Sequence, residues 1–225
     1  MKKLFVSFFA ASLMLLGTQA FAQVVPGAGY LHVIENSKNI KSGESTGDAF
    51  HTNGFYLGAS YKIRLGDYFG VAPGFYVDML FKSVNKDNGA TIAGIPIGGS
   101  ASYNYTEVAL NIPVNFSFKY EFTDNAAFVV FAGPTFQYGV MARSTFHGAV
   151  SIGGIHYSDG QAYNHYGKDG DSNPFNILLG GGLGIQIGDI QFIAGYDHTL
   201  LNCSRSDTGY YTGAHVIKAG INFAF

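Results

Sequence analysis

Hydrophobic and polar side chains alternate with a period of two from about residue 54 onward. The segment 105–122 shows this best: every second residue from Val108 to Phe122 is apolar, and the residues between are polar, charged or small. Successive side chains on a strand point to opposite faces, so the pattern predicts a strand with one apolar face. Similar alternation predicts strands at 54–65, 69–82, 105–122, 127–143, 175–187, 190–201 and 213–225.

The polar faces of these strands are unusually poor in charge. They carry mainly Gly, Ala, Asn, Ser and Gln, and Asp, Glu, Lys and Arg make up only 12% of the chain. A soluble sandwich or barrel buries its apolar face and needs a polar face that meets water. A membrane barrel inverts this arrangement, with apolar groups towards lipid and small polar groups inside. The pattern favours the membrane barrel and leaves a soluble barrel as the alternative.

The connections between strands alternate strictly between short and long. Short links lie at 66–68, 123–126 and 188–189, and long links lie at 36–53, 83–104, 144–174 and 202–212. Bacterial outer-membrane barrels have an even number of strands, with short periplasmic turns and long external loops. An even number requires one more strand, which fits residues 24–35. The fold predicted is therefore all-β, an eight-stranded antiparallel up-and-down transmembrane β-barrel.

A count of ten strands is the alternative, because residues 92–103 and 149–157 also alternate in part. These segments are rich in glycine and lack an aromatic face. We interpret them as strand extensions that project above the membrane.

The first 22 residues have the layout of a secretory signal peptide. Lys2 and Lys3 precede an apolar stretch from Leu4 to Leu16, and Ala20-Phe21-Ala22 supplies small residues before Gln23. We expect residues 1–22 to be removed and residues 23–225 to form the barrel. Together with the strand pattern, this predicts a protein of the bacterial outer membrane.

Composition excludes several other classes of protein. Thirteen Lys and Arg residues against 15 Asp and Glu residues leave no basic surplus for nucleic acid. The single cysteine, Cys203, excludes a disulfide scaffold. The abundance of 31 Gly, 20 Phe and 15 Tyr suits strands and turns better than a helical bundle.

Three motifs carry a resemblance to a known family. They are LNIPVNFSFKYEF at 110–122, FAGPTFQYG at 131–139 and the terminal KAGINFAF at 218–225. With these motifs the chain resembles the small outer-membrane β-barrel domain family of Bacteroidota, which includes PorT-like and OmpA-barrel-like proteins. The resemblance implies a barrel rather than an activity, because the family is functionally mixed. It also leaves open a secretion or assembly accessory role of the PorT-like kind.

The end of the last strand looks like the signal that the barrel-assembly machinery reads. The residues concerned are Phe225, Phe223 and Ile221. We expect that machinery and outer-membrane lipid to be the partners of the chain. The same residues are also simply the lipid-facing side of a last strand, and both interpretations can hold.

The predicted inner faces carry most of the charge. Buried charges must pair, so these residues predict a salt-bridged interior that blocks the barrel. A polar conduit for small ions is the alternative. The residues placed inside are Lys62, Arg64, Asp78, Lys82, Glu107, Lys119, Glu121, Arg143, Asp197 and Lys218.

Candidate chemistry is sparse. His147, His156 and His165 share the 144–174 link with several aspartates, but no compact metal-binding spacing supports a site. Cys203 has no base beside it, since the register of His198 points that ring towards lipid. We therefore predict no cofactor, no metal and no enzymatic activity. The predicted role is structural or surface-binding through the long external loops, with an unidentified extracellular ligand; a small-solute pore is the main alternative.

Overall fold

The computed structural model describes residues 22–92, 95–152, 155–205 and 209–224. All regular secondary structure in these ranges is β-strand. No helix in these ranges is long and apolar enough to cross a membrane. The predicted signal peptide lies outside the described residues apart from Ala22, where the first strand begins. The strands are β1 (Ala22–Asn39), β2 (Phe50–Arg64), β3 (Phe69–Ile92), β4 (Ile95–Thr123), β5 (Ala126–Ile152), β6 (Ile155–Asn164), β7 (Phe175–Ile187), β8 (Ile190–Thr199) and β9 (Tyr210–Phe223).

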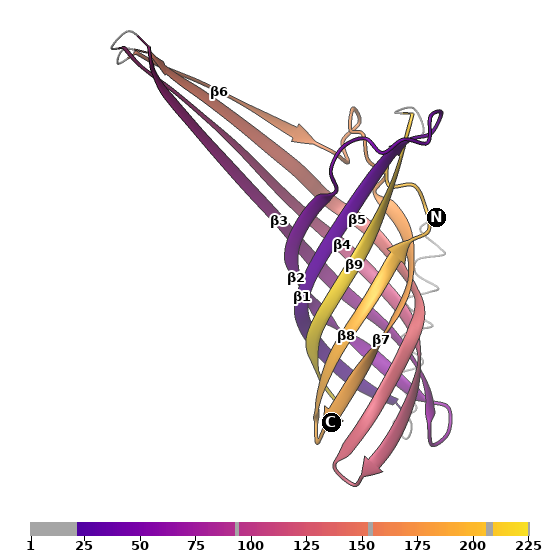
Figure 1. Ribbon diagram of the computed structural model, residues 1–225. Helices are drawn as coiled ribbons and strands as arrows, with labels where there is room; N and C mark the ends of the chain where they lie inside the picture. The colour runs from indigo at the N-terminus through magenta and orange to yellow at the C-terminus, as the bar shows by residue number, and fades with distance from the viewer. Residues whose placement is uncertain (1–21, 93–94, 153–154, 206–208, 225) are drawn as a thin grey trace.

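Eight of these strands close into a ring. Every strand pairs antiparallel with its neighbours in the order β4-β3-β2-β1-β9-β8-β7-β5, and pairing of β4 with β5 completes the circle. Figure 1 shows the tilted strands of this barrel, with the C-terminus at the end where the short turns lie. The predicted eight-stranded antiparallel barrel is confirmed, and residues 24–35 do form its first strand.

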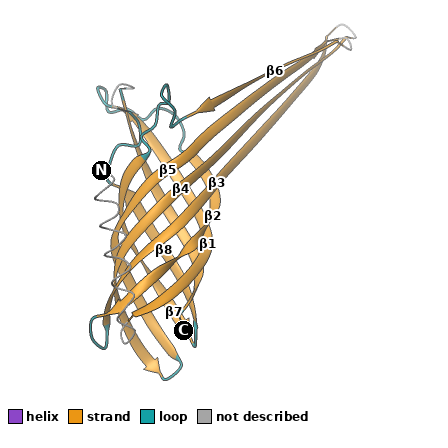
Figure 2. Cartoon of the chain, turned by 180° about the vertical axis from the view of Figure 1, so that it is seen from behind, coloured by secondary structure: helices purple, strands orange, loops and turns teal. Residues whose placement is uncertain are grey.

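The one strand that is not part of the ring is β6, which pairs only with β5 among the described strands. It lies on a sheet in which β3, β4 and β5 continue past the rim of the barrel, as Figures 1 and 2 show from opposite sides. Pairing of β3 with β4 runs without a loop to Ile92 opposite Ile95. Interpretation of residues 92–103 and 149–157 as extensions is therefore confirmed, whereas the long link predicted at 83–104 is wrong. We name the part of these strands beyond the level of Lys82 the external sheet; it comprises residues 83–92 of β3, 95–104 of β4, 145–152 of β5 and 155–162 of β6.

The apolar faces of the ring strands point outward, as predicted. On β4, Ile112 is 42% exposed while its neighbour Asn111 on the other face is 6% exposed. Large apolar side chains are exposed on the outside of all ring strands. They include Tyr30, Leu57, Phe75, Ile112, Phe116, Phe136, Leu179, Leu183, Phe192 and Ile217.

The interior contains more apolar side chains than the sequence pattern predicted. A buried cluster fills the middle and comprises Leu31, Val33, Tyr56, Leu80, Leu178, Ala214 and Val216. The Tyr56 ring crosses the interior where two strands carry glycine, and a Cβ on Gly220 would lie 2.1 Å from its hydroxyl oxygen. Leu178 of β7 is one of these inward residues, at 3% exposure.

A bulge in β5 changes which residues face inward near the long-loop end. Ala109 pairs with Gly139 but Val108 pairs with Met141, which leaves Val140 as an extra residue. One extra residue exchanges the two faces of the strand beyond it. Ala142 and Ser144 are therefore buried, and Arg143 is exposed on the outer side. The prediction that Arg143 faces the interior is wrong for this reason.

Candidate functional site

The long-loop end of the barrel opens into a cavity of about 550 Å³, which we call the mouth. Side chains from all eight ring strands and from the segments before β2, before β7 and after β8 line it. No lysine or arginine lines it among the described residues. Five carboxylates face it: Glu35, Asp48, Asp78, Glu107 and Asp171.

The wall of the mouth positions the Glu107 carboxylate with two tyrosines. The Tyr105 hydroxyl donates to Oε2 at 2.8 Å, and the Tyr166 hydroxyl donates to Oε1 at 2.7 Å. Tyr105 and Glu107 are neighbours on the inner face of β4, whereas Tyr166 comes from the segment between β6 and β7. Burial, and then the charge of Glu107, raise the pKa of Tyr166, so its hydroxyl stays protonated and remains a donor.

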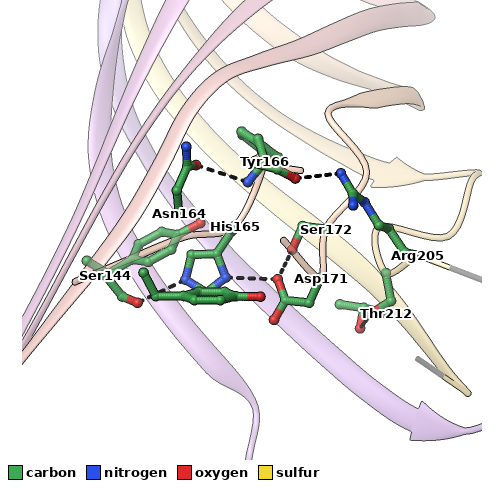
Figure 3. A network of polar contacts seen from close by, with 12 residues as sticks. Ser144, Asn164, His165, Tyr166, Asp171, Ser172, Arg205 and Thr212 are labelled. Carbon is green, nitrogen blue, oxygen red and sulfur yellow. Dashed lines mark hydrogen bonds and ion pairs between the residues drawn. The ribbon is translucent and has the colours of Figure 1, made fainter. Parts of the chain in front are cut away.

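His165 ties the same segment to the barrel wall. Its Nε2 lies 3.1 Å from the Ser144 hydroxyl of β5, and its Nδ1 lies 3.0 Å from Oδ1 of Asp171. Figure 3 shows this chain of contacts, which continues from Asp171 to Ser172. Arg205 closes the other side by donating to the backbone oxygens of Lys168 and Gly167. Residues 165–174 are thus held against the mouth from both sides.

The order Ser144, His165, Asp171 is that of a catalytic triad, because each ring nitrogen has the partner that a triad requires. Sequence analysis missed it, since Ser144 comes from a strand, His165 and Asp171 come from the segment between β6 and β7, and no local motif connects them. Its surroundings oppose acyl transfer, however. Ser144 is only 9% exposed and does not line the mouth, and the carboxylates there would repel a developing oxyanion. The arrangement fits a clamp on the loop better than a nucleophile.

Aromatic rings form one side of the mouth. The Phe50 ring meets Tyr103 and Tyr105 edge-on, at centroid distances of 6.3 and 5.4 Å. The Lys82 ammonium lies over the Phe50 ring, 3.7 Å from its centroid. This is a cation–π contact between an ammonium group and an aromatic wall.

A second, smaller cavity of about 140 Å³ lies deeper in the barrel. Lys62, Asp78, Asp197 and Lys218 all line it, and Lys218 Nζ is 2.6 Å from Oδ2 of Asp197. Leu178 and Val216 of the apolar cluster line both cavities. Asp78 and Gln137 also line both cavities, so apolar and polar side chains together lie where the two cavities meet.

The remaining predicted charges lie at the short-turn end or elsewhere on the wall. Lys119 and Glu121 form an ion pair at 2.7 Å in which the Glu121 side chain is 65% exposed. Arg64 is exposed where β2 ends. The structure thus brings together the pairs 197/218 and 119/121, places Lys82 on the aromatic wall, and gathers Asp78 and Glu107 at the mouth.

The other predicted sites are less informative. Phe223 and Ile221 are exposed on the outer face of β9, and Phe225 lies outside the described residues. Their role as an assembly signal stays a prediction. The described residues contain no group of three or more His, Cys, Asp and Glu side chains that could hold a metal ion. Cys203 is a free thiol to which Asn176 Nδ2 donates at 2.9 Å.

Comparison with known proteins identifies the family. Residues 21–204 match the family model described as outer membrane protein beta-barrel domain. The chain belongs to this family. It is therefore a transmembrane barrel of the bacterial outer membrane. Such barrels have short periplasmic turns and long external loops, so we expect the mouth and the external sheet to lie outside the cell. No curated protein matches the chain.

The solved structures that match this chain are distant in sequence. Ail of Yersinia pestis, solved with the heparin analogue sucrose octasulfate, is 13% identical, with coverage of 89% of this chain and 99% of that chain and a TM-score of 0.30. Neisserial surface protein A is 12% identical, with 91% and 99% coverage and a TM-score of 0.37. The outer membrane enzyme PagL is 9% identical, with 86% and 99% coverage and a TM-score of 0.35. At such low identities and scores, the ligands and activities of these proteins do not transfer to this chain.

Proposed function

We propose that this chain is a non-enzymatic surface-binding protein, in which the barrel anchors the external sheet and the sheet docks an extracellular partner. The observation that carries the proposal is an exchange of polarity between the two faces of β3, β4 and β5. Within the barrel the outer face is apolar. Beyond the rim the outer face becomes polar, with Asn85, Asp87, Asn104, Ser102, Ser100 and His147 along it.

The face that continues from the barrel interior gains exposed apolar side chains at the same level, in two rows separated by a row that contains Lys86 and Asp159. Directly opposite residues share a face, so the pairings of Val84 with Tyr103 and of Tyr103 with Phe146 place these three side chains in one row. Val150 and Tyr157 form a second pair farther out. Phe146, Val150 and Tyr157 are 53%, 48% and 71% exposed. We call this surface, Val84, Tyr103, Phe146, Val150 and Tyr157, the inner sheet face.

An exposed apolar face outside the membrane has a cost unless it meets a partner. Lipid does not explain it, because the face that would continue the lipid-facing surface is the polar one. Docking of an extracellular partner is the function that this arrangement supports best.

Peptide display on folded protein tests the proposal. Random peptides on phage are panned against the full chain in lipid nanodiscs, with the double variant Phe146→Ser/Tyr157→Ser as a matched target. We expect enriched peptides that bind the native chain and lose binding to the variant at least tenfold. Absence of enrichment, or equal binding to both, would overturn the proposal. Labelling of Ser144 by a fluorophosphonate would overturn its non-enzymatic part.

A small-solute pore is the second candidate, favoured by the polar cavities at both levels of the interior. The apolar cluster in the middle of the interior argues against it. Planar-bilayer recording separates the two roles: we expect no discrete conductance steps, and steady steps would favour the pore. Loss of secretion on deletion of the gene would instead favour the PorT-like accessory role.

A further inference from the structure

The charge of the mouth selects among the partners that the inner sheet face could dock. Glu35, Asp48, Glu107 and Asp171 face one cavity without a lysine or arginine lining it in the described part of the chain. Burial, and then the charges of Glu107 and Asp171, raise the pKa of Glu35 to about 8, so at neutral pH the negative charge of the mouth comes chiefly from Asp48, Glu107 and Asp171, with Lys82 as the opposing cation. Like charges held together in a partly enclosed cavity favour a bound cation and repel an anion.

The aromatic side of the mouth shows which cation this surface accommodates. Lys82 rests its ammonium group on Phe50, whose ring is itself packed edge-on against Tyr103 and Tyr105. Phe50, Tyr103 and Tyr105 also line the cavity. A primary ammonium or a guanidinium from a partner would meet the same rings, with carboxylates at hand.

The acidic mouth and the inner sheet face form one continuous surface. Tyr103 belongs to the apolar row with Val84 and Phe146, and it also lines the mouth. Tyr105, two residues along the same strand and on the same face, accepts the edge of Phe50 within the mouth. A ligand on the Tyr103 row therefore lies directly beside the carboxylates of the mouth, whereas the outer pair of Val150 and Tyr157 is separated from that row by Lys86 and Asp159.

Other occupants fit this surface less well. An anionic headgroup would be repelled by the carboxylates, and a second copy of the chain would bring two acidic mouths together. A bare divalent ion would leave the apolar face uncovered. A cavity of about 550 Å³ has room for a basic side chain with several waters.

We infer that the partner is a cationic amphipathic peptide segment, which lays apolar side chains on the inner sheet face and places a lysine or arginine in the mouth. This inference rests on the proposed docking function and deepens it. The sheet supplies apolar contact, and the mouth supplies selection for positive charge.

Designed peptides on matched variants test the inference. A ten-residue peptide of alternating Leu and Lys is compared with its Leu–Glu counterpart, with the full chain in nanodiscs of zwitterionic lipid and empty discs subtracted. We expect the Leu–Lys peptide to bind and the Leu–Glu peptide not to bind. At pH 9, above the pKa of about 8 of Glu35 and below that of the peptide lysines, Glu35→Gln/Asp48→Asn should raise the Kd of the Leu–Lys peptide at least tenfold, because it removes two negative charges from the mouth.

A control variant removes the same charge at the other end of the barrel. Glu121→Gln/Asp189→Asn should leave the Kd within twofold, and Phe146→Ser/Tyr157→Ser should raise it as the mouth variant does. Equal binding of both peptides, or equal loss in the mouth variant and the control, would overturn the inference. Display-selected peptides without basic residues would also overturn it, yet they would leave the docking function standing.

Discussion

The Lys218 ammonium lies 2.6 Å from Oδ2 of Asp197 inside the barrel, where Asp197 is only 6% exposed. The two side chains come from neighbouring strands, β8 and β9. Lys218→Met removes the cation and leaves a buried carboxylate without its partner, which costs about 3–5 kcal/mol. We expect this loss in the free energy of unfolding, measured by urea titration in lipid vesicles.

The double variant Lys218→Met/Asp197→Asn is the matched control for this pair. It removes both charges, so it should recover most of the stability lost in the single variant. A single variant as stable as the native chain would show that the pair does not neutralise a buried charge.

Ile112 and Asn111 are adjacent in β4 but face lipid and interior respectively. Ile112→Arg places a charge on the lipid face and should cost roughly 2–4 kcal/mol if the site lies near the middle of the membrane. Asn111→Ala on the inner face should cost far less, because it places no charge in hydrocarbon. Urea unfolding in vesicles measures both, and the reverse order of costs would contradict the assignment of faces.

The thiol of Cys203 should react slowly in the folded protein. Burial raises the pKa of Cys203 to about 12, with a smaller contribution from the charge of Glu35. A raised pKa keeps the group as the neutral thiol at pH 8, and the thiolate is the reactive form. We expect alkylation by iodoacetamide to be at least about a hundredfold slower than for a free thiol. The rate should increase as the pH rises towards 12 and should become normal in urea; fast labelling of the native chain at pH 8 would contradict it.

The hydrogen bond from Tyr166 to Glu107 should control how firmly residues 165–174 are held. Tyr166→Phe removes one of the two donors to a charged acceptor, a loss of about 1.5–3 kcal/mol. Because the raised pKa keeps Tyr166 protonated, the tether should not change between pH 6 and 9. We expect faster tryptic cleavage after Lys168, which is exposed in this segment, with unfolding of the barrel unchanged. Tyr157→Phe on the external sheet is the control, and equal cleavage rates in both variants would refute the tether.

Sequence periodicity predicted the barrel because lipid and interior impose opposite demands on alternate residues. Ile112 beside Asn111 is one example of a pair whose faces were predicted correctly. The same reasoning failed at Arg143, because the extra residue Val140 in β5 shifts the alternation and leaves no mark in the composition of the strand. It placed residues 92–103 and 149–157 above the membrane as strand extensions, but it took residues 83–91 for a loop, since a sheet outside the membrane needs no lipid-facing residues.

The mouth could be predicted only in part. Glu107 and Asp78 were expected on inner faces, but Glu35 lies in a strand with weak periodicity, and Asp48 and Asp171 come from loops. Their gathering around one cavity depends on tertiary structure. The contacts of His165 with Ser144 and Asp171 likewise join positions that no local pattern connects.

Fluorescence quenching by brominated lipid tests the central claim, that the apolar outer face contacts hydrocarbon. The chain has no tryptophan, so each introduced tryptophan is a single reporter. Phe136→Trp replaces an aromatic residue on the outer face of β5, and Tyr157→Trp replaces one on the external sheet. We predict that acyl-chain bromine strongly quenches the fluorescence of the Phe136→Trp variant and has little effect on that of the Tyr157→Trp variant. An unquenched Phe136→Trp variant would contradict the barrel orientation on which the whole account rests.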